Sequence, residues 1–315
     1  MKKFVQHRFF FPVCSFGLAF VCLLISCILF GFYPFGDKTV FTVDLYFQYA
    51  PMLAHLRRSI LDGNISLYSF TIGSGTSVLP LAAYYLFSPF NVILLFFSER
   101  LLSEAVLLII ILKLAFSAGT CAFSLESIVK KRSPFVLIFS LGYALSAYSM
   151  AYLWNVMWLD IVIALPLVVA AFERMMRTEK ITWYVVFLSF CMCVNYYISF
   201  MVCLFLVIYF LYYLLRENGN MRNNIEKFIR FILASLICVG CSMVVLLPVI
   251  ISNMEVSAAN VSSFKMESMS SIINLFGRSL FCSHPTIRSG NLPNIYTGVL
   301  VLIACGIFFV LSKIS

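Results

Sequence analysis

Long apolar segments recur along the chain and are separated by short polar connections. The strong segments run over 11–33, 104–127, 134–152, 158–173, 181–197, 199–215, 229–250 and 294–312. Each is close to the roughly 20 residues that a helix needs to cross the hydrocarbon core of a bilayer. The pattern predicts an all-α polytopic membrane protein with one transmembrane domain, 1–315, and about eight spanning helices.

Two features set the connections between these helices. A single helix over 181–215 would overshoot the bilayer, so we expect a tight turn at 195–197 between two helices. The segment 80–97 is interrupted by Pro89, and the residue before a proline is disfavoured in helical geometry. This segment is therefore predicted either to span or to form a re-entrant or interfacial element.

The distribution of basic residues decides between these alternatives. If 80–97 does not cross, 14 Lys and Arg side chains lie on the cytoplasmic side and 7 outside; if it crosses, the ratio is inverted. The positive-inside rule favours the first arrangement. It predicts a cytoplasmic N-terminus in a bacterial plasma membrane, with extracytoplasmic loops 34–103 and 251–293. The first of these loops is expected to contain juxtamembrane helices.

Composition excludes several functional classes. The chain is 62% hydrophobic and 11% charged, whereas soluble domains carry roughly a quarter charged residues. The net charge of +9 is explained by cytoplasmic loops facing anionic lipid, so no nucleic-acid partner is expected. The sequence contains no Cys/His ligand cluster, no phosphate-binding glycine loop and no hydrolase motif, so no metal ligands are assigned. A divalent cation is the one cofactor left open.

Asp44 and Gln48 are the first candidate site residues. They are spaced i, i+4 in the segment TVDLYFQY, so both are expected on one helical face. A carboxylate near the membrane interface is well placed to act as a general base or metal ligand. The alternative role for Asp44 is a helix N-cap, which the residues alone favour about two to one.

Asp160 and Asn155 are the second pair of candidates. Asp160 lies just inside a predicted spanning helix, where a carboxylate costs about 2.5–3.5 kcal/mol and usually faces a polar cavity. The alternative is an interfacial cap that reaches water. The neighbouring Trp154 and Trp158 are predicted to form an aromatic belt at the outer interface.

Lys113 and Tyr196 complete the set. Lys113 is a basic residue deep inside a predicted span, so it needs a partner such as a carboxylate or a lipid phosphate. A structural buried pair and a ligand contact are equally compatible with that position. Tyr196 lies in the predicted outer turn, where an ordinary aromatic-belt residue is slightly favoured over a binding role.

Six segments through the chain resemble the YfhO family of bacterial membrane proteins. They are GDKTVFTVDLYFQYAP (36–51), AYYLFSPFN (83–91), SLGYALSAY (140–148), WNVMWLD (154–160), NYYISFM (195–201) and LPNIYTG (292–298). The resemblance implies a GT-C-type fold and a glycosyltransferase. Such an enzyme takes a sugar from a polyprenyl-phosphate donor and transfers it, on the outer face, to a cell-wall polymer such as lipoteichoic acid.

The resemblance also implies roles for individual residues. Asp44 and Asp160 occupy the positions of the acidic residues in the first and second outer loops of GT-C enzymes and would be catalytic. Gln48, Lys113, Asn155 and Tyr196 would bind substrate. Members of the family are usually much longer, which implies that this chain is a truncated copy or a gene fragment.

Two other functional classes stay open on the residues alone. A buried Lys and Asp within spanning helices are also compatible with the ion or substrate path of a transporter or permease. A non-catalytic membrane scaffold is the third reading. It predicts that the carboxylates on the outer face can be replaced without effect.

Overall fold

The computed structural model describes residues 8–72, 75–217, 220–257, 272–280 and 293–312. Five of its helices are long and apolar enough to cross a membrane. They are α2 (Phe10–Phe30), α5 (Leu102–Val129), α8 (Leu159–Thr178), α10 (Tyr196–Glu217) and α11 (Met221–Ser257). The chain is therefore an all-α polytopic membrane protein, as predicted.

Shorter apolar helices occupy the other three predicted spans. They are α6 (Phe135–Ala144) with α7 (Ala147–Ala151), α9 (Thr182–Val194) and α13 (Val299–Ser312). The predicted span 134–152 is broken at Leu145, and the Ser146 hydroxyl then accepts a hydrogen bond from the Ser149 amide. Because these helices are short, the count of eight spanning helices stays a prediction.

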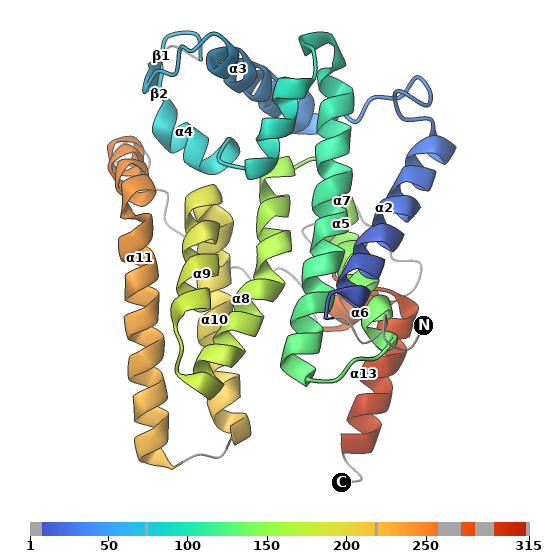
Figure 1. The fold of residues 1–315 in the computed structure, drawn as a ribbon, viewed down its shortest axis with the longest axis vertical. Coiled ribbons are helices and arrows are strands. Elements are labelled where there is room, and N and C mark those ends of the chain that lie inside the picture. The colour runs from blue at the N-terminus through green and yellow to red at the C-terminus, as the bar shows by residue number, and fades with distance from the viewer. Residues whose placement is uncertain (1–7, 73–74, 218–219, 258–271, 281–292, 313–315) are drawn as a thin grey trace.

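The helices form one bundle in which α5 packs against α2, α6 and α8 (Figure 1). Helix α9 packs against α8 and α11, and α13 packs on α6. Helix α2 ends and α5 begins at the same end of the bundle (Figure 1). The connection between them, 31–101, therefore leaves and returns at that end.

This connection is built from short elements. They are the π-helix η1 (Leu45–Tyr49), α3 (Ala50–Leu61), strands β1 (Tyr68–Ser69) and β2 (Thr76–Ser77), α4 (Val78–Tyr85), and the 3₁₀ helices η2 (Pro89–Phe96) and η3 (Glu99–Leu101). The two strands pair antiparallel. Helices α4 and η2 meet at an angle of 95° across the break before Pro89, a geometry that fits either a broken span or a re-entrant element.

The predicted break between α9 and α10 is present, and α11 is longer than predicted. Helices α9 and α10 are separate, with the break at Asn195, so the predicted turn is correct and shorter than expected. The Asn195 side chain accepts a hydrogen bond from the Ile198 amide at 2.9 Å and so caps α10. Helix α11 has 37 residues and exceeds the predicted span 229–250 at both ends. Much of the loop 251–293 lies outside the described residues.

Small residues bring α2, α5 and α6 close together. Ala19, Ala115, Ala118 and Ala144 are fully buried at their contact. The Ser140 hydroxyl of α6 donates to Ser15 of α2 at 2.8 Å. Close backbone approach through small residues is the usual way in which helices associate in lipid.

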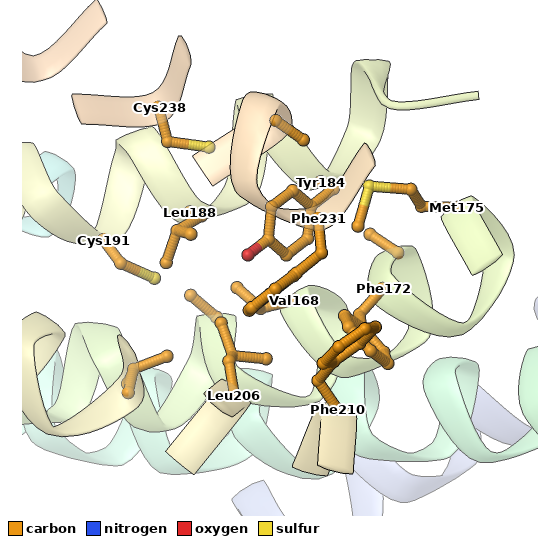
Figure 2. Close-up of a cluster of buried hydrophobic side chains, with 14 of the residues drawn as sticks. Val168, Phe172, Met175, Tyr184, Leu188, Cys191, Leu206, Phe210, Phe231 and Cys238 are labelled. Atoms are coloured by element: carbon orange, nitrogen blue, oxygen red, sulfur yellow. The ribbon is translucent and has the colours of Figure 1, made fainter. Parts of the chain in front are cut away.

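Bulky residues hold together the other half of the bundle. Figure 2 shows Phe172 of α8 surrounded by side chains from α9, α10 and α11. Its ring lies 6.3 Å from Tyr184, 6.3 Å from Phe210 and 5.8 Å from Phe231, and the last two rings are stacked at 4.8 Å. This half is fixed by aromatic packing, so it provides a rigid support for the polar end of the bundle.

Pro166 interrupts α8, and neighbouring helices compensate for it. A proline has no N–H to donate to the carbonyl four residues earlier, here Val162. The Tyr143 hydroxyl donates to that carbonyl at 2.7 Å, and the Thr120 hydroxyl donates to the Ile163 carbonyl at 2.8 Å. The freed backbone acceptor is thus satisfied from α6, as a membrane interior requires.

Tyr143→Phe is expected to destabilise the protein by about 1–2 kcal/mol, because it leaves the Val162 carbonyl without a donor. Thermal unfolding of the purified protein in detergent measures the loss. Tyr148→Phe is the control, since no hydrogen bond of that hydroxyl is found within the described residues. Equal melting temperatures for the two variants would refute the role of Tyr143.

Candidate active site

Asp44 presents an open carboxylate at the end of the bundle where α2 ends. Its side chain is exposed and makes no hydrogen bond or ion pair with any described residue. Asp44 stands at the N-cap position of η1, as the alternative reading expected, but its side chain makes no capping hydrogen bond. A hydrated carboxylate without a partner is available to accept a proton from a ligand.

The backbone around Asp44 is unusual on both sides. Val43 has φ of 50°, a left-handed conformation that is a genuine outlier for a β-branched residue. The residues that follow, Leu45–Tyr49, form a π-helix instead of the expected α-helix. Both features are costly, and both concentrate at functional sites, where the surrounding structure holds them in place.

Two tyrosines stand next to this carboxylate. Gln48 donates from its amide to the Tyr85 hydroxyl at 3.0 Å. Tyr49 is buried and donates to the Asn155 side chain at 3.1 Å, while its ring stacks on Trp154 at 6.1 Å. Burial, and then the Asp44 carboxylate and Tyr85, raise the pKa of Tyr49 above its ordinary value. Tyr49 therefore stays protonated and acts as a donor.

Tyr84 connects this cluster of tyrosines to α8 and α10. The Trp158 indole donates to the Tyr84 hydroxyl at 3.3 Å, and the Asn195 amide donates to the Tyr84 carbonyl at 2.9 Å. The half-buried Tyr196 of α10 lies with its ring 5.9 Å from Tyr84. Both Trp154 and Trp158 are half-buried against tyrosines, whereas a simple aromatic belt would face lipid.

Asp160 and Lys113 form a buried ion pair. Their side chains are 1% and 0% exposed, and the ammonium lies 2.7 Å from one carboxylate oxygen. The other carboxylate oxygen accepts from the Ser88 hydroxyl at 2.9 Å. The ammonium also donates to the Val156 carbonyl at 2.9 Å and lies over the Phe90 ring. A carboxylate is thus the partner that the position of Lys113 demanded.

A comparison with family models gives one match. The family described as "Bacterial membrane protein YfhO" matches residues 15–315. The chain belongs to the YfhO family. Comparisons with curated proteins and with solved structures find no match. The chain is thus a multi-pass bacterial membrane protein.

The predicted site residues of this YfhO-family chain fall into two groups. Asp44, Gln48, Asn155 and Tyr196 gather around three tyrosines, Tyr49, Tyr84 and Tyr85. Asp160 and Lys113 lie in a separate buried contact that bridges α5, α8 and the α4–η2 break. A small cavity lined by Tyr49, Tyr85, Ser88 and Lys113, among others, connects the two groups. The two carboxylates are therefore not equivalent.

Asn155, which lies between these two sets of residues, has an unsatisfied hydrogen-bond donor. The side chain is 1% exposed, and no described residue offers its amide nitrogen a hydrogen-bond partner. Since a buried polar group without a partner costs about 1–3 kcal/mol, the structure retains it at a cost. An unpaired donor beside Tyr49 is a group that a bound hydroxyl or phosphate oxygen would satisfy.

The sequence did not single out Tyr49, Tyr84, Tyr85 or Ser88 in this YfhO-family chain. The only signal was that all four lie in segments that carry the family resemblance, Tyr49 in 36–51 and the other three in 83–91. For metals, no group of three or more His, Cys, Asp or Glu side chains occurs within the part of the chain that the structure describes. A divalent cation stays a prediction without an assigned ligand set.

Proposed function

We propose that the chain is a membrane glycosyltransferase, or the N-terminal part of one, with its active site around Asp44. The observation that carries the proposal is an open carboxylate beside an aromatic, hydrogen-bonding wall of three tyrosines. Membership of the YfhO family places this site in a bacterial membrane protein. Aromatic walls with a few convergent polar groups are the usual lining of small-ligand sites, and their faces suit a sugar ring.

The proposed reaction transfers a sugar from a polyprenyl-phosphate donor to a hydroxyl of a cell-wall polymer such as lipoteichoic acid. Asp44 takes the proton of the acceptor hydroxyl while the oxygen of that hydroxyl bonds to the anomeric carbon of the donor sugar. The bond between that carbon and the donor phosphate oxygen breaks, and polyprenyl phosphate leaves with the electron pair. Proton removal by a positioned carboxylate typically contributes about 10²–10⁴ to such a rate.

The other polar groups bind and position the substrates in this proposal. Gln48, Asn155 and Tyr196 offer amide and hydroxyl groups to the sugar or the phosphate. Asp160 was predicted to be catalytic, but both of its oxygens are engaged and it is buried. We therefore assign Asp160 and Lys113 a positioning role. Lys113 fixes the carbonyl of Val156, next to Asn155, and Asp160 fixes Ser88 at the break between α4 and η2.

The proposed topology puts the site on the outer face of the plasma membrane. The ends of α5, α8 and α10 that carry basic residues lie at the other end of the bundle from α3 (Figure 1), and such residues mark the cytoplasmic side. A lipid-linked sugar and a wall polymer both occur outside the cytoplasm, so this orientation serves the proposed substrates.

Deletion and complementation test the function. A strain lacking the gene is expected to show reduced sugar on its wall polymers, restored by the intact chain expressed from a plasmid. Solute uptake is measured in the same strains. Normal polymer glycosylation with altered uptake would replace the transferase by a transporter, and no change in either would favour a scaffold.

A further inference from the structure

A cavity lies at the end of the bundle where α5 and α8 end. It has a volume of about 650 Å³ and opens between the ends of α5 and α8 and the start of α9. Its wall contains five basic side chains and two acidic ones: Arg8, Lys130, Arg132, Arg174, Arg177, Glu126 and Glu173. The wall thus carries an excess of positive charge.

The two acidic groups do not neutralise this excess. Glu173 is buried, and its oxygens accept from Arg177 at 2.7 Å and from the Tyr209 hydroxyl at 2.7 Å. Glu126 faces Arg132. Within the described parts of the chain, Arg8, Lys130 and Arg174 make no ion pair. Three cations are therefore available to an anionic ligand.

The remaining wall of the cavity is apolar and partly open. Phe123, Leu167 and Phe187 line it, together with Trp183, which is 49% exposed at the start of α9. The Arg8 guanidinium lies over the Phe123 ring. A tryptophan at the end of an apolar helix is typical of the headgroup level of a bilayer. The cavity therefore has a polar part for a headgroup and an apolar part for a chain.

Glu126 adds a second requirement for the ligand. Its Oε1 atom is buried and has no hydrogen-bond partner among the residues that the structure describes. A buried acceptor oxygen in that position requires a hydrogen-bond donor from the ligand. The phosphate group that the cations attract has no O–H to donate when it is a phosphodiester. A ligand that combines a phosphodiester with a hydroxyl group satisfies the cations and Glu126 together.

We propose that this cavity binds the headgroup of an anionic phospholipid of the cytoplasmic leaflet, with a phosphodiester and a free hydroxyl, as in phosphatidylglycerol. The phosphate lies among Arg8, Lys130 and Arg174, and the headgroup hydroxyl donates to Glu126. The apolar wall at Trp183 receives the start of an acyl chain. This site is independent of the transferase site at the other end of the bundle.

Native mass spectrometry of the full chain in detergent tests the proposal. The chain is expected to retain phosphatidylglycerol over phosphatidylcholine. It is also expected to retain it about tenfold over phosphatidylethanol, which has the same charge but no headgroup hydroxyl. Lys130→Gln/Arg174→Gln is expected to weaken phosphatidylglycerol binding about 25-fold, at about fivefold for each cation.

A matched control removes the same charge near the ends of the same two helices, α5 and α8. Lys131→Gln/Lys180→Gln replaces exposed cations that do not line the cavity, and its binding should change by less than about twofold. Arg8→Gln tests the site from another element, and a loss of about fivefold is expected even if the double variant does not fold.

Any one of five outcomes would overturn the assignment. Wild-type binding by Lys130→Gln/Arg174→Gln or by Arg8→Gln would exclude the cavity, as would an equal loss in the control. Equal retention of phosphatidylcholine would exclude an anionic ligand, and equal retention of phosphatidylethanol would exclude the hydroxyl contact. Binding of free glycerol phosphate without phosphatidylglycerol would make the ligand a soluble phosphate.

Discussion

Asp44→Asn is expected to lower the rate of sugar transfer about 10²–10⁴-fold while leaving the amount of folded protein unchanged. The amide has nearly the same shape but cannot accept the proton of the acceptor hydroxyl. Folding is expected to be unaffected, because the carboxylate is exposed and makes no bond with any described residue. Sugar incorporated into wall polymer, per amount of protein in the membrane, measures the effect.

Asp62→Asn is the matched control for this experiment. Asp62 is exposed in the same outer segment, at the end of α3, and should be replaceable without loss of transfer. Transfer that continues at the normal rate in Asp44→Asn, at a normal protein level, would rule out Asp44 as the base. The functional proposal would then have to rest on another group.

Lys113→Met is expected to destabilise the protein by about 3–5 kcal/mol, the second large effect. It leaves the Asp160 carboxylate buried without a counter-charge, in a site where both side chains are at most 1% exposed. Thermal unfolding in detergent and the level of protein in the membrane both report the loss. The effect arises from the isolated charge and not from the missing packing, since Met fills most of the space of Lys.

Removing both charges separates these two causes. Lys113→Met/Asp160→Asn leaves no buried charge and retains an acceptor for Ser88, so it should recover most of the lost stability. Arg222→Met/Glu226→Gln removes both charges of an exposed ion pair of α11 and should change the stability of the protein little. A double variant that is no more stable than Lys113→Met would contradict the ion-pair explanation.

Features governed by local chemistry were predictable from the sequence. Asn195 separates two apolar segments that are too long for one helix, and a break occurs there. Pro89 marks the bend of 95° in the predicted re-entrant element. An isolated charge in lipid is costly, so the sequence predicted that the Lys113 ammonium has a partner. In each case a single residue imposes the constraint.

Features governed by contacts between distant segments were not predictable. The i, i+4 spacing of Asp44 and Gln48 suggested an α-helix, but tertiary packing of Tyr49 against Trp154 and Asn155 accompanies a π-helix there. Hydrophobic periodicity carries no information about such pairings, which join residues 106 positions apart. The same holds for the Tyr143 hydroxyl that serves the carbonyl freed by Pro166.

The length of α5 has a consequence for where the proposed chemistry takes place. Its 28 residues extend about 42 Å, whereas the hydrocarbon core is roughly 30 Å thick, so about eight residues have no lipid to cross. Early residues of α5, such as Ala105 and Val106, are buried instead by Leu45, Tyr49 and Leu94 of the connection 31–101. Under the proposed topology, this extension of α5 lies outside the hydrocarbon core and holds Asp44 in water beyond the bilayer surface. A hydrophilic polymer can then be modified there without entering the lipid phase.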